Sequence, residues 1–350
     1  MTPLSTEDRA ELTDTVRRLL QKHAPLESAR APYDGGEAFD RDTWRRLADE
    51  LGVVALQAAE ESGGQGCSLT EVAAVATELG AVLARTPYVW SSGVVVSALT
   101  YLGETTVSEQ LAGGRIASYA SGFTATADRV SGAVPRVPWA GVADWLVVLA
   151  DEGGTPVLLA VETAGLVRTD RQSFDRTVPL ADLSAEDVPA LVLARGEAAA
   201  EAARFGEDCG AVVLAAELVG AAGTLLDRAV RYAKDRHQFG KPIGAQQAVK
   251  HQLADVAVEL ELARAAVTAA LPHLHPGADR TRAVATAKAL ASDMALKAAD
   301  TGLHVHGGMG FTWEQESHLF LRRARFASGA FGDPRRHRGA YLDSLLGGVR

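Results

Sequence analysis

The sequence predicts an α+β fold with an N-terminal helical domain, a small middle β-domain and a C-terminal four-helix bundle. Apolar residues recur at helical spacing in both end regions, whereas the middle has short apolar runs separated by turn residues. The chain has 350 residues, which exceeds one typical domain, so several packed units are expected. The predicted domain boundaries are 1–114, 115–194 and 195–350.

The N-terminal domain is predicted to consist of helices. Ser5 or Thr6 can cap a first helix, whose apolar residues recur at helical spacing from Leu12 onward. Asp40 can open a second helix, and residues 69–83 have the pattern of a third. The glycines of "AAEESGGQGCSL" predict a loop between the second and third helices.

The middle domain has the pattern of a small β unit. Apolar runs at 145–150 and 156–161 are separated by the turn sequence "DEGG", and "VSGAVPRVPWAGVADW" is also rich in turn residues. We expect an antiparallel unit of about eighty residues, given ordinary strand and loop lengths.

The C-terminal domain is helical again and rich in alanine. A first helix is predicted over 195–233, a second from Gln246 to about Leu271, and a third from Asp279 to His306. Two shorter helices follow, separated at Gly332-Asp333-Pro334. Because alanine allows helices to approach closely, these long helices favour an antiparallel bundle.

Composition argues against several classes of function. The formal net charge of -9 opposes a nucleic-acid surface, which requires a basic field. Cys67 and Cys209 are too few for a disulfide framework and have no metal-binding spacing. The first residues are polar and acidic, unlike a signal peptide, and apolar runs such as 94–99 are too short to span a membrane. We therefore expect a cytoplasmic protein with no nucleic acid, membrane or metal partner.

Two motifs link the helical segments to a known family. "RHQFGKPIGAQQ" (Arg236–Gln247) resembles the Arg-x-x-Phe-Gly-x-Pro-Ile signature of acyl-CoA dehydrogenases, and "LHVHGGMGFTWE" (Leu303–Glu314) resembles their Gln-x-x-Gly-Gly-x-Gly-Phe signature. The motifs occur in the family's order and are separated by two long helices. "AEESGGQG" (Ala59–Gly66) and "VSGAVPRVPWAGVADWLVV" (Val130–Val148) are also similar to family segments. The resemblance therefore covers nearly the whole chain.

The resemblance implies the acyl-CoA dehydrogenase fold and an FAD cofactor, whose adenosine diphosphate end reaches a neighbouring subunit. Arg236 would offer a guanidinium fork to the pyrophosphate, Phe239 would pack on the nucleotide, and Gly307 with Gly308 would bring bare backbone N–H groups to phosphate. His304 stands where relatives have Gln. The implied cofactor-binding residues are Arg236, His237, Gln238, Phe239, Gln246, Gln247, His304, Val305, His306, Gly307 and Gly308.

A structural alternative exists for both motifs. Arg236 could be a solvated cation at a helix end, and the glycine pair could be an ordinary helix C-cap. The matched spacing of the two motifs favours the cofactor interpretation.

The catalytic base of the family has no clear counterpart. Relatives remove the substrate α-proton with a carboxylate while the β-hydrogen leaves as hydride to the flavin. Most carry a Glu in a Tyr-Glu-Gly-Thr segment, and the corresponding residues here, 330–333 or 331–334, contain no Glu. Asp333 is the nearest carboxylate, and the alternative base position on the first bundle helix is Gly210. The family's flavin-ring segment is replaced by "YASGFTATADRV" at 119–130.

The sequence keeps the two signatures that would bind the nucleotide but lacks the catalytic Glu and the flavin-ring segment. This pattern favours a subunit without a catalytic base. The chain resembles the subunit without Glu in actinobacterial heterotetrameric (α2β2) acyl-CoA dehydrogenases of steroid side-chain degradation. The implied partners are an acyl-CoA substrate, a paralogous dehydrogenase subunit, and an electron-transfer flavoprotein or other electron acceptor.

Three alternatives stay open. The first is a homomeric enzyme, as a homotetramer, with Asp333 or the mid-helix Glu217 as a displaced base, although pairing with a bundle cation is the usual role of such a Glu. The second is a flavin monooxygenase or oxidase of the same fold, and the third is a purely structural subunit.

Overall fold

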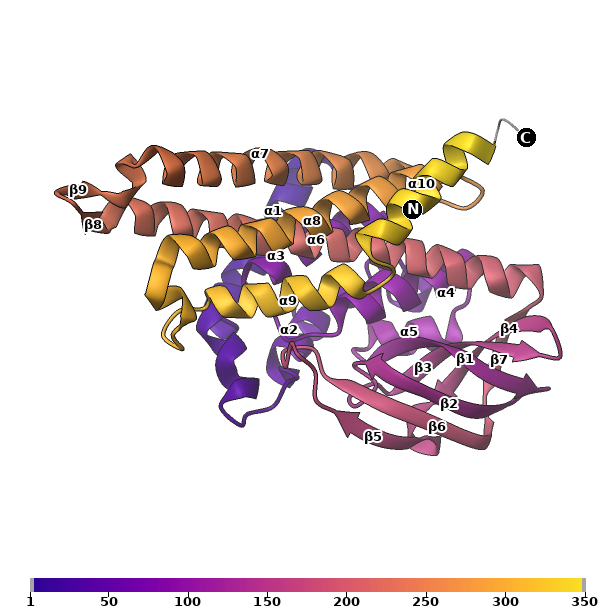
Figure 1. Ribbon diagram of the computed structural model, residues 1–350. Helices are drawn as coiled ribbons and strands as arrows, with labels where there is room; N and C mark the ends of the chain where they lie inside the picture. Colours follow the sequence, from indigo (N-terminus) through magenta and orange to yellow (C-terminus); the bar gives the residue numbers. More distant parts are fainter. Residues whose placement is uncertain (1–2, 348–350) are drawn as a thin grey trace. The chain divides into compact units, whose positions relative to one another are not determined.

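The structure is a computed structural model that describes residues 3–347, and its N-terminal region is helical as predicted (Figure 1). Ser5 caps the first helix, because its hydroxyl accepts from the Asp8 N–H at 3.1 Å. Asp40 caps the second by accepting from the Thr43 N–H at 3.1 Å. The helical segments, of which η4 is π-helical, are α1 Thr6–His23, η1 Leu26–Tyr33, α2 Arg41–Asp49, η2 Val53–Ala55, η3 Glu60–Ser62, α3 Leu69–Ala81, η4 Val89–Val95, α4 Val96–Leu102 and α5 Thr106–Ala112.

The middle region forms one seven-stranded sheet with the order β5-β6-β2-β1-β3-β4-β7. A short 3-10 turn, η5 (Thr163–Gly165), precedes β5. Neighbouring strands pair in antiparallel fashion except β1 and β3, which are parallel. The strands are β1 Ala117–Thr126, β2 Arg129–Pro138, β3 Trp145–Glu152, β4 Thr155–Glu162, β5 Val167–Arg171, β6 Leu180–Pro189 and β7 Leu191–Arg195.

The parallel pair corrects the expectation of a purely antiparallel unit. Strand β2 returns antiparallel to β1, and residues 139–144 then bring the chain back to the beginning of β1. The Asp144 carboxylate accepts from the Ile116 N–H at 2.8 Å, and the Trp145 N–H donates to the Ile116 carbonyl at 3.0 Å. These bonds fix the start of β3 beside the start of β1, so the two strands run in the same direction.

The C-terminal region is helical, with a small hairpin after its first helix (Figure 1). Helix α8 packs against α7, α9 and α10, which forms the predicted bundle. The helices α9 and α10 are separated at the predicted break before Pro334. The elements are α6 Glu197–Asp235, β8 His237–Gln238, β9 Lys241–Pro242, η6 Ile243–Ala245, α7 Gln247–Ala270, η7 Leu271–His273, α8 Thr281–His306, η8 Gly307–Phe311, α9 Ser317–Gly329 and α10 Pro334–Leu346.

Glycine and alanine allow α6 to make close helix contacts. A Cβ at Gly220 would collide with the carbonyl of Thr77 on α3, and a Cβ at Gly302 of α8 would lie 2.9 Å from the Leu225 side chain. By length and composition α6 could cross a membrane, but 78% of its apolar window is buried inside the protein. Burial in the bundle therefore accounts for its apolar composition.

Two compact units are recognised in the described residues. One comprises the residues up to 16 with 31–75 and 85–210, and the other comprises 17–30, 76–84 and the residues from 211 onward. The sheet lies in the first unit and the helices α7 to α10 lie in the second. The three predicted domain boundaries stay a prediction.

Candidate functional site

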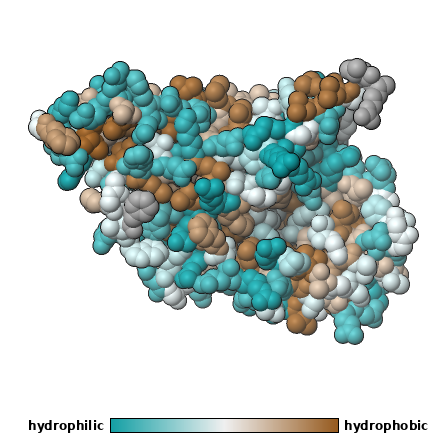
Figure 2. Space-filling model, viewed as in Figure 1, coloured by the Kyte–Doolittle hydropathy of each residue, from teal (hydrophilic) through white to brown (hydrophobic). Residues whose placement is uncertain are grey.

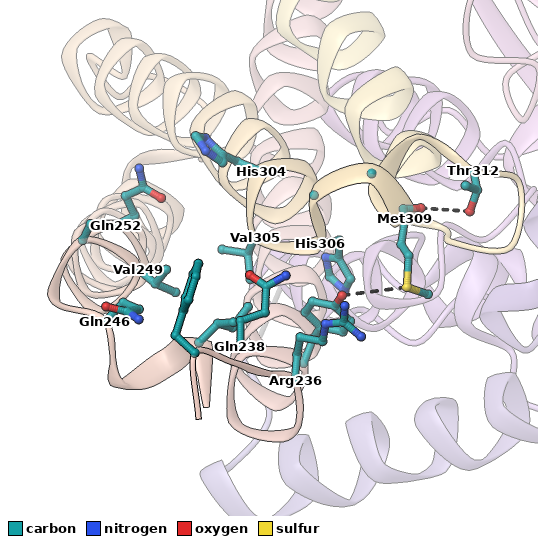
Figure 3. A pocket seen from close by; sticks show the side chains of 16 residues that line it. Arg236, Gln238, Gln246, Val249, Gln252, His304, Val305, His306, Met309 and Thr312 are labelled. Carbon is teal, nitrogen blue, oxygen red and sulfur yellow. Dashed lines mark hydrogen bonds between the residues drawn. The ribbon is translucent and has the colours of Figure 1, made fainter. Parts of the chain in front are cut away.

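The second unit contains a cavity of about 920 Å³ where α6 ends, α7 begins and α8 ends (Figure 3). Residues from α7 line one side in Figure 3, and the last turn of α8 lines another. The lining residues are Tyr232, Arg236, Gln238, Phe239, Ile243, Gln246, Ala248, Val249, Gln252, His304, Val305, His306, Gly307, Gly308, Met309 and Thr312.

Local backbone structure places Arg236 at the cavity. The Arg236 N–H donates to the Tyr232 carbonyl at 2.8 Å, so this residue extends the last turn of α6. The Arg236 carbonyl accepts from the Ile243 N–H at 2.8 Å, which closes the β8–β9 hairpin. Phe239 and Gly240 turn the hairpin with φ of 54° and 76°, and the Phe239 side chain is 91% exposed. The sequence between the two helices is thus a projecting hairpin.

The glycine pair presents bare backbone to the same cavity. Gly307 has φ 58°, and its N–H donates to the His304 carbonyl, so it ends α8. An added Cβ would meet no atom within 4 Å at either Gly307 or Gly308. The C-cap interpretation is therefore correct for Gly307, and it leaves open space beside the peptide groups of both glycines.

A stack of side chains supports this segment from α6. The His306 Nδ1 lies 2.7 Å from the Gly302 carbonyl, and the His306 ring packs on Tyr232 with centroids 4.5 Å apart. The Tyr232 hydroxyl lies 3.8 Å from the Met309 sulfur (Figure 3). Tyr232 and Met309 were not among the predicted site residues. The four-residue spacing between Tyr232 and Arg236 was the available signal, because it puts both on one face of α6.

The structure gathers nine of the eleven predicted cofactor-binding residues around the cavity. His237 and Gln247 are not among the lining residues. The His237 ring turns back toward the Asp235 carbonyl, 3.1 Å from Nδ1, and Gln247 is the exposed first residue of α7. Sequence reasoning missed seven lining residues, namely Tyr232, Ile243, Ala248, Val249, Gln252, Met309 and Thr312.

Comparison with known proteins identifies the family. The acyl-CoA dehydrogenase N-terminal domain matches residues 6–115, and the C-terminal domain matches 208–345. The acyl-CoA dehydrogenase IpdE2 of Mycolicibacterium smegmatis is 32% identical over 333 residues, which covers 94% of this chain and 96% of that protein. IpdE2 of Mycobacterium tuberculosis is 34% identical over 342 residues, with 96% of each covered. The chain belongs to the acyl-CoA dehydrogenase family.

Solved structures agree with this assignment. A variant of the Tcur3481-Tcur3483 steroid ACAD has a TM-score of 0.87 at 27% identity, and 98% of this chain and 99% of that one are covered. The ChsE4-ChsE5 complex of Mycobacterium tuberculosis has a TM-score of 0.88 at 25% identity, with 99% of both chains covered. Butyryl-CoA dehydrogenase of Megasphaera elsdenii, at 20% identity and a TM-score of 0.88, shares the fold.

Acyl-CoA dehydrogenases are FAD-dependent oxidoreductases, and the cavity fits the diphosphate end of FAD. Among the described residues no acidic side chain pairs with Arg236, so its guanidinium is available to an anion. The open backbone at Gly307 and Gly308 adds room for an anion beside peptide groups. The donors around the cavity thus suit a phosphate ligand.

Asp333, the carboxylate nearest in sequence to the segment expected for the usual base, serves as a helix cap. Its carboxylate accepts from the Arg336 N–H at 2.7 Å, and the residue is exposed. Beside it the fully buried Lys288 donates to the carbonyls of Ala327 at 3.0 Å and Gly332 at 3.3 Å. Burial lowers the pKa of Lys288 to about 8. The connection between α9 and α10 is thus organised by a buried cation.

Glu217 is occupied by an ion pair. Its carboxylate accepts from the Arg323 guanidinium, and both residues are buried. This bears out the prediction that a mid-helix Glu pairs with a bundle cation. Gly210 on α6, which the sequence comparison predicted as the counterpart of the alternative base, has no side chain.

Proposed function

We propose that this chain is the subunit without a catalytic base in a hetero-oligomeric (α2β2) acyl-CoA dehydrogenase, and that it helps bind FAD. One observation carries the proposal. Nine of the eleven predicted nucleotide-binding residues meet in one cavity, whereas the segments expected to carry a base offer only the helix cap Asp333 and Gly210, which has no side chain.

In this proposal each side of the cavity has a binding role. Arg236 donates to the pyrophosphate, and the backbone of Gly307 and Gly308 receives phosphate oxygens without obstruction. Phe239, on the projecting hairpin, packs on the nucleotide. When bound, FAD would supply the acceptor for the substrate β-hydrogen, which leaves as hydride. The partner subunit supplies the carboxylate that removes the α-proton, and an electron-transfer flavoprotein or other acceptor takes the electrons.

The substrate class is an acyl-CoA thioester. Similarity to the Tcur3481-Tcur3483 steroid ACAD favours an acyl group derived from a steroid. The names of that protein and of the ChsE4-ChsE5 complex each join two chains, which supports an assembly of two kinds of subunit.

The surface of the second unit supports an oligomer. Figure 2 shows hydrophobic surface over part of α7 and toward the end of α10. Val258 and Leu262 on α7 are 60% and 54% exposed, and no residue of α10 is buried. Leu342 and Leu346 on α10 are 55% and 62% exposed. Exposed apolar residues in such numbers favour a protein interface.

Expression with and without a partner tests the proposal. The chain is purified alone and after co-expression with a paralogous acyl-CoA dehydrogenase that carries the Tyr-Glu-Gly-Thr segment. We expect that only the complex retains FAD and oxidises acyl-CoA. A yellow, fully active homotetramer from this chain alone would contradict the proposal. Oxygen uptake with a flavin reductase would instead support a monooxygenase, and absence of flavin from both preparations would favour a structural subunit.

A variant of Arg236 tests the cavity itself. In the complex, Arg236→Lys should raise the rate of FAD release about tenfold, because lysine cannot form the bidentate contact. Arg231→Lys, an exposed arginine on α6 outside the cavity lining, is the matched control. Release rates that match in the two variants would remove Arg236 from the cofactor site.

A further inference from the structure

Residues on one side of α6 contact both ends of the segment 307–316, which begins with Gly307 and Gly308. Arg228 and Tyr232 follow each other at four-residue spacing on α6, and Arg236 continues the spacing just beyond its end, so all three lie on one side. Tyr232 supports the beginning of the segment through His306, as described above. Arg228 contacts its far end, through the carboxylate of Glu316.

Glu316 is a buried carboxylate held by two arginines. Its Oε1 accepts from Arg30 Nη2 at 2.6 Å, and its Oε2 accepts from Arg228 Nη2. The residue is 4% exposed and lies directly before α9. Arg30 belongs to η1 and Arg228 to α6, so a single carboxylate joins three segments of the second unit.

Between its two ends the segment 307–316 has side-chain contacts at Met309, with Tyr232, and at Trp313, with His318. Gly307 and Gly308 have no side chains, and Met309 and Trp313 are 46% and 56% exposed. The glycine pair that lines the cavity therefore has no side-chain packing of its own. Its conformation depends on the contacts of its neighbours His306 and Met309 and on the anchor at Glu316.

We propose that Glu316 is a positioning residue that, with Arg30 and Arg228, holds the segment 307–316 in the nucleotide-binding conformation before the nucleotide arrives. The inference rests on the proposed role of the cavity. A segment that loses one anchor must be ordered again at each binding event, which costs conformational entropy. The anchor removes that cost beforehand.

The second buried Glu–Arg pair provides a matched control. Glu217 and Arg323 join the same helices α6 and α9, are also buried, and take no part in the cavity lining. Glu316→Gln replaces one of the two accepting oxygens by an NH2 group, which can only donate hydrogen bonds. That NH2 group would then face the N–H donors of one arginine, with no acceptor between them. Glu217→Gln makes the same chemical change away from the cavity.

The experiment measures FAD release from the co-expressed complex by the rise in flavin fluorescence after dilution. Glu316→Gln should release FAD about tenfold faster than the wild type, from the loss of one charge-assisted hydrogen bond. Glu217→Gln should release FAD at the wild-type rate, even where both variants melt at lower temperature. Hydrogen exchange of the complex gives a second readout, because only Glu316→Gln should speed exchange of the amides in 307–316.

The outcomes separate this inference from the proposed function. If Arg236→Lys speeds FAD release and Glu316→Gln does not, the cavity binds the nucleotide and the positioning role is wrong. If neither variant changes the rate, the proposed function of the cavity fails, and the inference fails with it. Arg30→Gln leaves the Arg228 contact in place and should give an intermediate rate. If Glu316→Gln does not fold, the Arg30→Gln variant tests the positioning role in its place. A wild-type rate of FAD release from Arg30→Gln would overturn the inference.

Discussion

The guanidinium of Arg323 on α9 donates to the carboxylate of Glu217 on α6 in the interior of the bundle. The side chains are 4% and 10% exposed, so neither charge is well solvated. A second nitrogen of Arg323 lies 3.5 Å from the Ala84 carbonyl. Because the pair satisfies a buried cation, its carboxylate is committed to structure.

Removal of this carboxylate should cost stability. Glu217→Gln should lower the free energy of unfolding by about 3 kcal/mol, because it leaves Arg323 buried without its counter-ion. Urea unfolding followed by circular dichroism measures the change. The control is Glu261→Gln, from the exposed pair with Arg264, which should change stability by less than about 0.5 kcal/mol. Unchanged stability together with lost turnover would instead make Glu217 a base.

Asp333 should behave as a cap in every assay. Asp333→Asn should keep stability within a few tenths of a kcal/mol, whereas Asp333→Ala should lose about 1 kcal/mol, because Asn can accept from the Arg336 N–H and Ala cannot. Turnover by the complex should be unaffected by Asp333→Asn. Loss of turnover in Asp333→Asn with FAD retained would revive the homomeric enzyme with a displaced base.

Lys288 should make stability depend on pH above neutrality. Burial lowers its folded-state pKa to about 8, from the usual 10.5. Below pH 8 both states bind the proton, and the cost of the buried charge is present in full. Between pH 8 and 10.5 the unfolded state keeps the proton that the folded state loses, so the free energy of unfolding should rise by up to about 3 kcal/mol.

Chemical unfolding across this pH range tests the assignment. Lys288→Met should abolish the rise, and Lys250→Met, at an exposed site on α7, should retain it. The other charged groups near Lys288 are Asp333 and Asp293, which favour its protonated form, and His337. Burial and the charge of Lys288 lower the pKa of His337, so His337 titrates below the range of pH 8 to 10.5 in which Lys288 acts. If the free energy of unfolding rises equally with pH in both lysine variants, groups other than Lys288 cause the rise.

Two glycines on α6 should respond in opposite directions to the same substitution. Gly220→Ala should destabilise the protein by about 1–3 kcal/mol, because its Cβ would collide with the Thr77 carbonyl. At Gly223 the nearest atom is a Leu260 methyl at 4.0 Å, so Gly223→Ala should stabilise by up to about 1 kcal/mol through helix propensity. Thermal melts of the two variants check the prediction. Equal changes would mean that α3 and α6 approach less closely.

The exposed face of α10 should be required for assembly. Leu342→Asp should leave the chain folded, since the side chain is already 55% exposed, and should reduce complex formation with the partner subunit. Size-exclusion chromatography with light scattering measures the mass. Val167→Asp, at a 69% exposed position on β5, is the control and should assemble normally. Normal assembly of Leu342→Asp would place the interface elsewhere.

The sequence by itself determined the helical ends, the β-rich middle and most of the cavity lining. Helix periodicity, the cap at Asp40 and the break before Pro334 depend on short-range backbone chemistry, which the order of residues specifies directly. The same holds for Arg236 and Gly307, because each is placed by a local turn at a helix end. The fold class followed from these features, and the FAD cofactor followed from the resemblance of the two motifs to the acyl-CoA dehydrogenase signatures.

Only the tertiary structure decided the long-range partners. The parallel pairing of β1 and β3 depends on the crossing at 139–144, and the Glu316–Arg30 contact joins residues 286 positions apart. No periodicity encodes such pairs, because each forms only when separate elements pack and exclude water from both groups. For the same reason packing made Glu217 an ion-pair partner and Glu316 an anchor, whereas the cap at Asp333 follows from its local sequence before Pro334.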